Sequence, residues 1–185
     1  MPRIATLDEQ QVYAAFRELE EEANIRDVYL EQLYTFGDPD RDPRGRVVTV
    51  AYYALIDAAG RTLRASADAD EARWFPVSAL PKLAFDHARI VKSALARLRG
   101  RANYTTVAFQ LMPRAFTIEE LHRVYGIIAG RPLDRRNFRK KILSLGILAD
   151  TGKTTAGRPS RPGRLYRLKT PAVVRLQERG VVMPY

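Results

Sequence analysis

Four residues near the N-terminus combine side chains that suit metal-assisted chemistry. Arg17, Glu18, Glu21 and Glu22 stand within one stretch of helical character. The three glutamates occupy positions i, i+3 and i+4, so they share one face of a helix. Like charges this close repel, but Mg²⁺ or Mn²⁺ would turn them into hard oxygen ligands that hold a diphosphate and activate water. Arg17 would orient one carboxylate. Spacing alone favours the plainer interpretation, a solvated acidic helix face.

A second set of residues, near the C-terminus, has the chemistry to bind a polyanion. Residues 134–142 read DRRNFRKKI, so basic side chains alternate with an apolar stripe of Phe138, Ile142 and Leu145. Arginine forks match phosphate or the guanine edge, and Asn137 would pair with adenine, with a position facing the first helix as its equal alternative. The predicted DNA-binding residues are Arg135, Arg136, Asn137, Arg139 and Lys140 on this helix, with Lys153, Arg158, Arg161 and Arg164 at the tip of the hairpin that follows.

The elements around these basic residues are those of a winged helix. Thr117-Ile118-Glu119-Glu120 is a capping box that opens a helix to about Ala129, and Gly130-Arg131-Pro132 ends it. A second helix, 135–145, is capped by Asp134 and closed by Gly146, and a strand from Ile147, a loop 151–163 and a strand 165–168 follow. A helix, a turn, a helix and a hairpin in this order predict DNA binding. The alternative is a solvated basic helix on an ordinary domain.

The N-terminal half predicts a mixed helix and strand domain. We expect a helix over 6–24, strands over 28–36 and 46–56 joined by a turn-rich loop, a short strand over 72–77, and a helix from Phe85 to Arg99. Gly100 would end that helix and mark the boundary. The predicted domains are therefore residues 1–100 and 101–185.

Charge separates the same two halves. The chain carries a net charge of +10, but residues 97–185 hold 19 Lys and Arg against 5 Asp and Glu, whereas residues 1–96 carry a net −4. The basic half is expected to meet a polyanion. The sequence has no cysteine and two histidines, which excludes disulfides, thiolate zinc sites and a histidine-rich metal site. No signal peptide or apolar run of about 20 residues is present, which fits a cytoplasmic protein.

The acidic helix resembles the Nudix box. The pattern is Glu9, seven residues, then Arg17-Glu18-Leu19-x-Glu21-Glu22-x-x-Ile25. The family's two glycines are replaced here by Arg3 and Asn24, and the strands that precede the box in Nudix proteins are absent from this sequence. The resemblance implies an α+β chain: an N-terminally incomplete Nudix-like α/β/α domain followed by a winged helix-turn-helix domain.

The rest of the chain resembles the Nudix-related transcriptional regulators of NAD metabolism, the NrtR type. The supporting segments are residues 34–39 and 42–48, 74–77 and 83–87, 116–121, 133–141, 157–159 and 165–166. The resemblance implies a homodimeric repressor that binds a palindromic DNA operator and senses ADP-ribose or a related nucleotide. Arg44 and Arg46 would meet the diphosphate, and Tyr34 or Phe36 would stack on a base, although plain core packing is the alternative for Phe36.

Two other interpretations stay open. The first is an active, Mg²⁺-dependent Nudix hydrolase of ADP-ribose-like diphosphates, which the glutamates favour and Arg3 and Asn24 oppose. The second is a shortened gene product whose open sheet edge needs covering by dimerisation or strand exchange.

Overall fold

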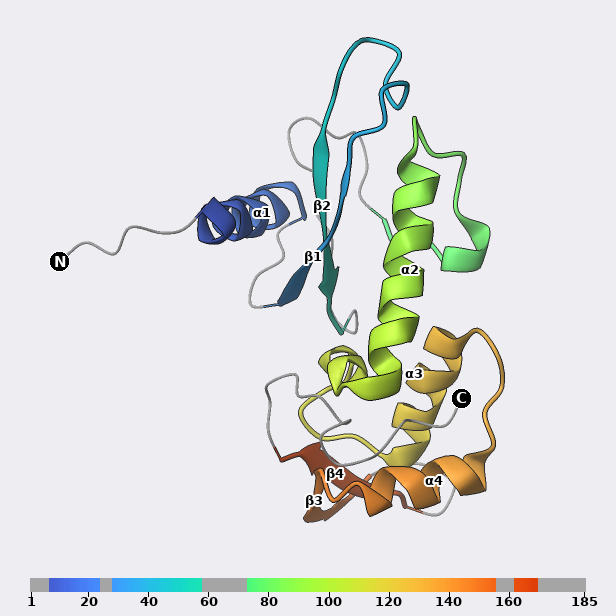
Figure 1. Ribbon diagram of the computed structural model, residues 1–185. Helices are drawn as coiled ribbons and strands as arrows, with labels where there is room; N and C mark the ends of the chain where they lie inside the picture. The colour runs from blue at the N-terminus through green and yellow to red at the C-terminus, as the bar shows by residue number, and fades with distance from the viewer. Residues whose placement is uncertain (1–6, 24–27, 58–72, 156–161, 170–185) are drawn as a thin grey trace, which may run out of the picture. The chain divides into compact units, whose positions relative to one another are not determined.

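The computed structural model describes residues 7–23, 28–57, 73–155 and 162–169. Contacts within the chain divide it into two units, Met1–Ala94 and Leu95–Tyr185. Figure 1 traces the elements of both. Within the described ranges, no helix has the length and apolar character needed to cross a membrane. The domain boundary after residue 100 stays a prediction.

The first unit begins with helix α1, Leu7–Ala23, and a hairpin (Figure 1). Strands β1, Tyr29–Phe36, and β2, Thr49–Leu55, pair in antiparallel fashion. The helix and both strands agree with the sequence prediction. Thr6 and Asn24, the first and last residues of the predicted helix, lie outside the described residues.

A bulge in β1 decides which side chains face the core. The strand register shifts between Gln32 and Tyr34, so Leu33 is the extra residue. A bulge breaks the strict alternation of inward and outward residues. Leu33 and Phe36 are consequently both buried, and they form a small core with Ala51.

The prediction of a short strand over residues 72–77 is wrong. Residues 73–76 have no regular structure, and Val77–Ala79 forms the 3₁₀ turn η1; Ala72 lies outside the described residues. Proline at position 76 has no N–H to donate to a strand ladder. Trp74 and Phe75 are also exposed, so no burial offsets the cost of ordering a strand.

Helix α2 spans His87–Tyr104 and continues through Gly100, which corrects the predicted end at Arg99. Glycine inside a helix costs only about 1 kcal/mol relative to alanine, so packing of the next turn can override it. Ala102, in that turn, is fully buried. At the other end Phe85 has φ 47° and lies outside the helix, and the carbonyl of Asp86 accepts hydrogen bonds from the N–H groups of Arg89 and Ile90 in the first turn.

The second unit has the predicted helix-turn-helix. After the 3₁₀ turn η2, Val107–Leu111, helix α3 covers Ile118–Ala129 and helix α4 covers Arg135–Ser144 (Figure 1). The capping box at Thr117 is formed in both directions, with the Thr117 hydroxyl accepting from the Glu120 N–H and the Glu120 carboxylate accepting from the Thr117 N–H.

The hairpin after α4 completes the winged helix. Strands β3, Leu148–Thr154, and β4, Arg164–Leu168, are antiparallel, and a bridge between Phe116 and Tyr166 adds a third short segment. The predicted loop from Thr151 begins later than expected, because residues 151–154 extend β3. Residues 156–161 of the loop lie outside the described part of the chain.

Aromatic rings fill the core of this unit. Tyr125 on α3 lies 5.3 Å from Phe138 on α4 and 6.4 Å from Phe109 on η2, measured between ring centroids. Phe109 in turn lies 5.7 Å from Phe116. Phe138 and Tyr125 are both buried, so the contact between these rings packs the apolar stripe of α4 against α3.

Candidate functional site

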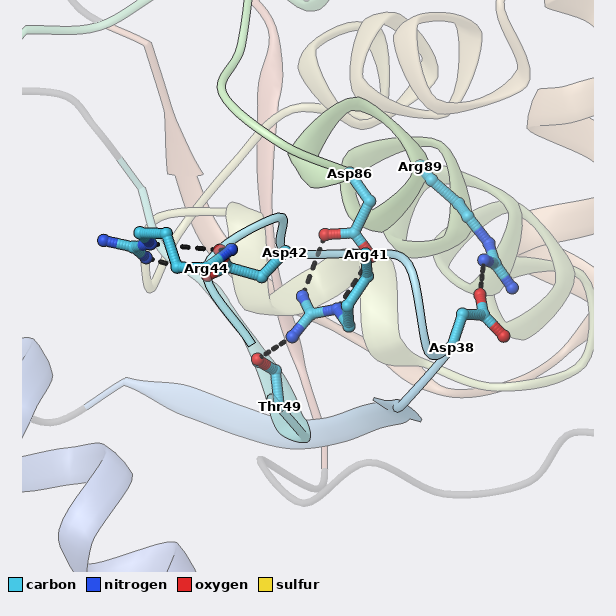
Figure 2. Close-up of polar contacts among 7 residues, drawn as sticks. All are labelled: Asp38, Arg41, Asp42, Arg44, Thr49, Asp86 and Arg89. Carbon is cyan, nitrogen blue, oxygen red and sulfur yellow. Dashed lines mark hydrogen bonds and ion pairs between the residues drawn. The ribbon is translucent and has the colours of Figure 1, made fainter. Parts of the chain in front are cut away.

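The loop between β1 and β2 is anchored by a buried arginine that the sequence analysis did not single out. Arg41 donates from Nε and Nη2 to the two carboxylate oxygens of Asp86, at 3.0 and 2.8 Å, and from Nη1 to the Thr49 hydroxyl (Figure 2). The Asp86 hydrogen bond raises the pKa of Arg41, and the guanidinium holds the pKa of Asp86 below its usual value. This paired geometry ties the loop to the start of α2.

A second pair in the loop presents a guanidinium to solvent. Arg44 donates from Nε and Nη2 to the Asp42 carboxylate, at 3.0 and 2.8 Å, and its backbone N–H also bonds Asp42 (Figure 2). These hydrogen bonds lower the pKa of Asp42 to about 2. The Asp42 side chain is 8% exposed and that of Arg44 75% exposed, so the acid is buried while the cation stays accessible.

The other predicted effector residues divide between surface and core. Arg46 is exposed and has no ion-pair partner among the described residues, and Tyr34 is 60% exposed. Phe36 is only 3% exposed and packs with Leu33 and Ala51. The structure therefore places Phe36 in the core, the alternative considered for it, because the bulge at Leu33 turns its ring inward.

The acidic helix is solvated in the part that can be described. Glu18 and Glu21 are exposed, and Arg17 lies 3.8 Å from Glu21 with both side chains about two-thirds exposed (68% and 66%). The Glu22 side chain lies outside the described residues. Within those residues no three acidic or histidine side chains come together as a metal site. The described residues thus do not by themselves fit a divalent cation.

The predicted DNA-binding helix displays its polar residues on the surface. Phe138, Ile142 and Leu145 are buried, whereas every predicted contact on α4 is exposed: Arg135, Arg136, Asn137, Arg139 and Lys140. Helix propensity and the Asp134 cap, which accepts from the Asn137 N–H at 2.7 Å, start the helix at this point. The apolar stripe decides which side faces the core, and the basic residues are left outward.

Most of these cations are available to a ligand. Arg135, Arg136 and Lys140 form no ion pair with another described residue, and Arg139 lies 3.8 Å from Glu119 across a half-exposed pair. Exposed ion pairs contribute about 0–1 kcal/mol, so a phosphate can displace Glu119 at little cost. The uncompensated charge on one helix face suits a polyanion.

The wing contributes further exposed cations. Lys153 on β3 is exposed, and Arg164 at the start of β4 donates to Asp150 at 3.2 Å from an exposed position. Arg158 and Arg161, also predicted to contact DNA, lie outside the described residues.

His122 contacts both the turn and helix α4. Its Nε2 lies 2.9 Å from the Leu133 carbonyl oxygen, and its ring meets Phe138 edge to face at 5.2 Å. It therefore joins α3 to the turn and to α4.

Sequence reasoning missed the residues whose ion pairs anchor the loop between β1 and β2. Arg41, Asp86, Asp38 and Arg89 form ion pairs that connect residues 38–41 with α2. The only sequence signal was Asp86 just before a helix, which reads equally well as a helix cap. Their pairing over more than forty positions has no local signature.

Comparisons with known proteins agree with this geometry. Residues 6–94 match the NUDIX domain family and residues 108–168 match the NrtR DNA-binding winged helix domain. The chain is 36% identical over 163 residues to the ADPR responsive transcriptional repressor NtrR of Acinetobacter baylyi, covering 86% of this chain. It is 42% identical over 87 residues to an ADP-ribose pyrophosphatase of Methanocaldococcus jannaschii, covering 47% of this chain.

Solved structures give the same relationship. NrtR of Shewanella oneidensis in complex with a 27mer DNA matches with a TM-score of 0.69 and 29% identity, over 91% of this chain and 74% of that chain. A second structure of that protein matches at 0.67 and 33%, over 83% and 70%. The chain spans 64% of the length of the Acinetobacter repressor and 50% of the pyrophosphatase. A Nudix domain followed by an NrtR winged helix, in one chain with this resemblance along most of its length, makes this protein a member of the NrtR family of Nudix-related transcriptional regulators.

Proposed function

We propose that this protein is a DNA-binding transcriptional repressor of NAD-related genes that responds to ADP-ribose or a similar nucleotide. The observation that carries the proposal is the exposed basic face of α4. Arg135, Arg136 and Lys140 form no ion pair with another described residue, while the apolar stripe of the helix is buried. An α-helix fits the major groove of B-DNA, and a wing with Lys153 and Arg164 extends the contact to the backbone. The repressor relative and the DNA-bound NrtR structure support the same assignment.

The nucleotide would act at the first unit. Arg44 and Arg46 are exposed guanidinium groups on the β1–β2 loop and suit a diphosphate, and Tyr34 offers an accessible ring for a base. The ADPR-responsive relative supports ADP-ribose as the ligand class. Ligand binding would shift the population of homodimers between arrangements that differ in the spacing of the two winged helices. Such a regulator would meet its DNA in the cytoplasm.

A mobility-shift assay with the full chain tests the proposal. The probe is a set of promoter fragments from NAD-related genes of the source genome, with and without ADP-ribose. We expect binding to a two-fold symmetric site and a change in affinity when ADP-ribose is added. The R135Q/R136Q variant should bind DNA more weakly, whereas R17Q, which removes one positive charge from α1, should bind as the wild type does. Absence of binding to every fragment would reject the repressor assignment.

A second candidate function is a hydrolase of ADP-ribose-like diphosphates. The observation that favours it is the identity with an ADP-ribose pyrophosphatase over nearly half of this chain. Glu18, Glu21 and Glu22 would then hold Mg²⁺ or Mn²⁺, although the described carboxylates alone do not assemble such a site. Incubation with ADP-ribose and Mg²⁺ should release AMP if the chain is active, and E21Q should abolish the release. No AMP from the wild-type protein rejects this function without affecting the first.

A further inference from the structure

Phe85 has a backbone conformation that calls for an explanation. It is the one described residue other than glycine with a positive φ, at 47°, and the residue is 52% exposed. Bulky L-residues rarely enter this left-handed region, and such residues concentrate at ligand clamps and other sites where the surroundings hold the strain. Burial of the ring does not account for the conformation, because about half of the residue remains in solvent.

The ring of Phe85 lies beneath the guanidinium of Arg44. The Arg44 Cζ atom is 5.0 Å from the centroid of the Phe85 ring, and the His87 ring meets Phe85 edge to face at 5.9 Å. A guanidinium over an aromatic face is attracted by the ring quadrupole. The left-handed backbone at Phe85 therefore brings the aromatic face to the loop residue that was expected to bind the diphosphate.

Arg44 is consequently held from two directions. Asp42 accepts two of the five N–H bonds of the guanidinium, and the aromatic face of Phe85 supports the planar group. The remaining N–H groups have no other partner among the described residues, and the side chain is largely exposed. A fixed guanidinium with unused donors loses less rotamer entropy on binding an anion than a freely rotating arginine would.

We propose that Phe85 is a positioning residue for Arg44, and that Asp42, Arg44 and Phe85 form a preorganised receptor for the diphosphate of the nucleotide. This inference rests on the proposed function, since it concerns the same ligand. It assigns to Phe85 an effect on affinity that acts through Arg44 and needs no contact with the ligand.

The test compares ADP-ribose affinity of full-chain variants by isothermal titration calorimetry. Phe85→Gly removes the ring at a position where glycine adopts the backbone without strain, so the fold is retained. The matched control is Phe75→Gly, because Arg73 lies over the Phe75 ring at 4.5 Å in another exposed pair of the same unit. Exposed cation–π pairs predict a loss of roughly two- to five-fold for Phe85→Gly and no change for Phe75→Gly.

Two further variants separate positioning from general stability. Phe85→Tyr keeps the aromatic face and should restore wild-type affinity, and Arg44→Gln should weaken binding more than Phe85→Gly does. The melting temperature of Phe85→Gly without ligand should match that of the wild type or exceed it. Equal affinities of Phe85→Gly and wild type, or of Arg44→Gln and wild type, overturn the receptor while leaving ADP-ribose sensing intact. A wild-type protein that binds no ADP-ribose overturns both.

Discussion

Replacement of Phe138 by alanine tests whether the apolar stripe of α4 holds the helix in place. The ring is 3% exposed and lies 5.3 Å from Tyr125 and 5.2 Å from His122, so its removal leaves a cavity between two rings. Buried Phe→Ala substitutions cost about 3–5 kcal/mol. In a domain of this size each kcal/mol lowers the melting temperature by about 4–8 °C, so the winged-helix unit should lose at least about 12 °C.

Thermal unfolding followed by circular dichroism measures this loss. The control is Leu143→Ala, also in α4, where the side chain is 40% exposed and the change should stay within about 1 kcal/mol. Two equal losses, or an unchanged melting temperature for Phe138→Ala, would refute the view that burial of this stripe determines which face of α4 is presented.

Three further predictions concern caps, backbone and charge. Thr117→Ala removes one half of the capping box and should cost about 1 kcal/mol of unfolding free energy, measured by urea titration. Gly130→Ala should lower the free energy of unfolding by more than about 1 kcal/mol, because φ is +69° and the new Cβ would lie 3.1 Å from Arg99 Nη2. In an Arg99→Ala background the steric part of this loss should disappear, and the part due to the positive φ should remain. Arg44 lowers the pKa of Asp42 to about 2, below an unfolded value of about 3.9, so stability from this pair is present above about pH 4 and lost as pH falls towards 2. In the Arg44→Gln variant the urea midpoint of unfolding should depend less on pH across that interval than it does in the wild type. The same pH dependence in both proteins would contradict the pairing.

Local patterns predicted the winged-helix unit closely, because its signals are short in range. The capping box at Thr117, the Asp134 cap and the apolar stripe of α4 each lie within one or two helical turns, and all three are present in the structure. Their consequence, an outward basic face, needed only helical geometry.

The first unit was predicted less completely, because its decisive features are not local. A one-residue bulge at Leu33 moved Phe36 into the core, and alternation alone cannot locate a bulge. Gly100 was expected to end a helix, but burial of Ala102 outweighs a weak local preference. The pairing of Arg41 with Asp86 joins segments 45 positions apart, and Phe85 shows its left-handed backbone only in three dimensions.

The salt dependence of DNA binding tests the central claim most directly. Each phosphate neutralised by a lysine or arginine contributes about 0.9 to the slope of log K against log salt concentration. The full chain, titrated with an operator fragment between low and physiological salt, should show a steep negative slope. Arg135→Gln with Arg136→Gln should reduce that slope by up to about 2, and Arg17→Gln should leave it unchanged. Binding that is insensitive to salt, or a slope that the α4 variant does not alter, would contradict DNA recognition by this helix.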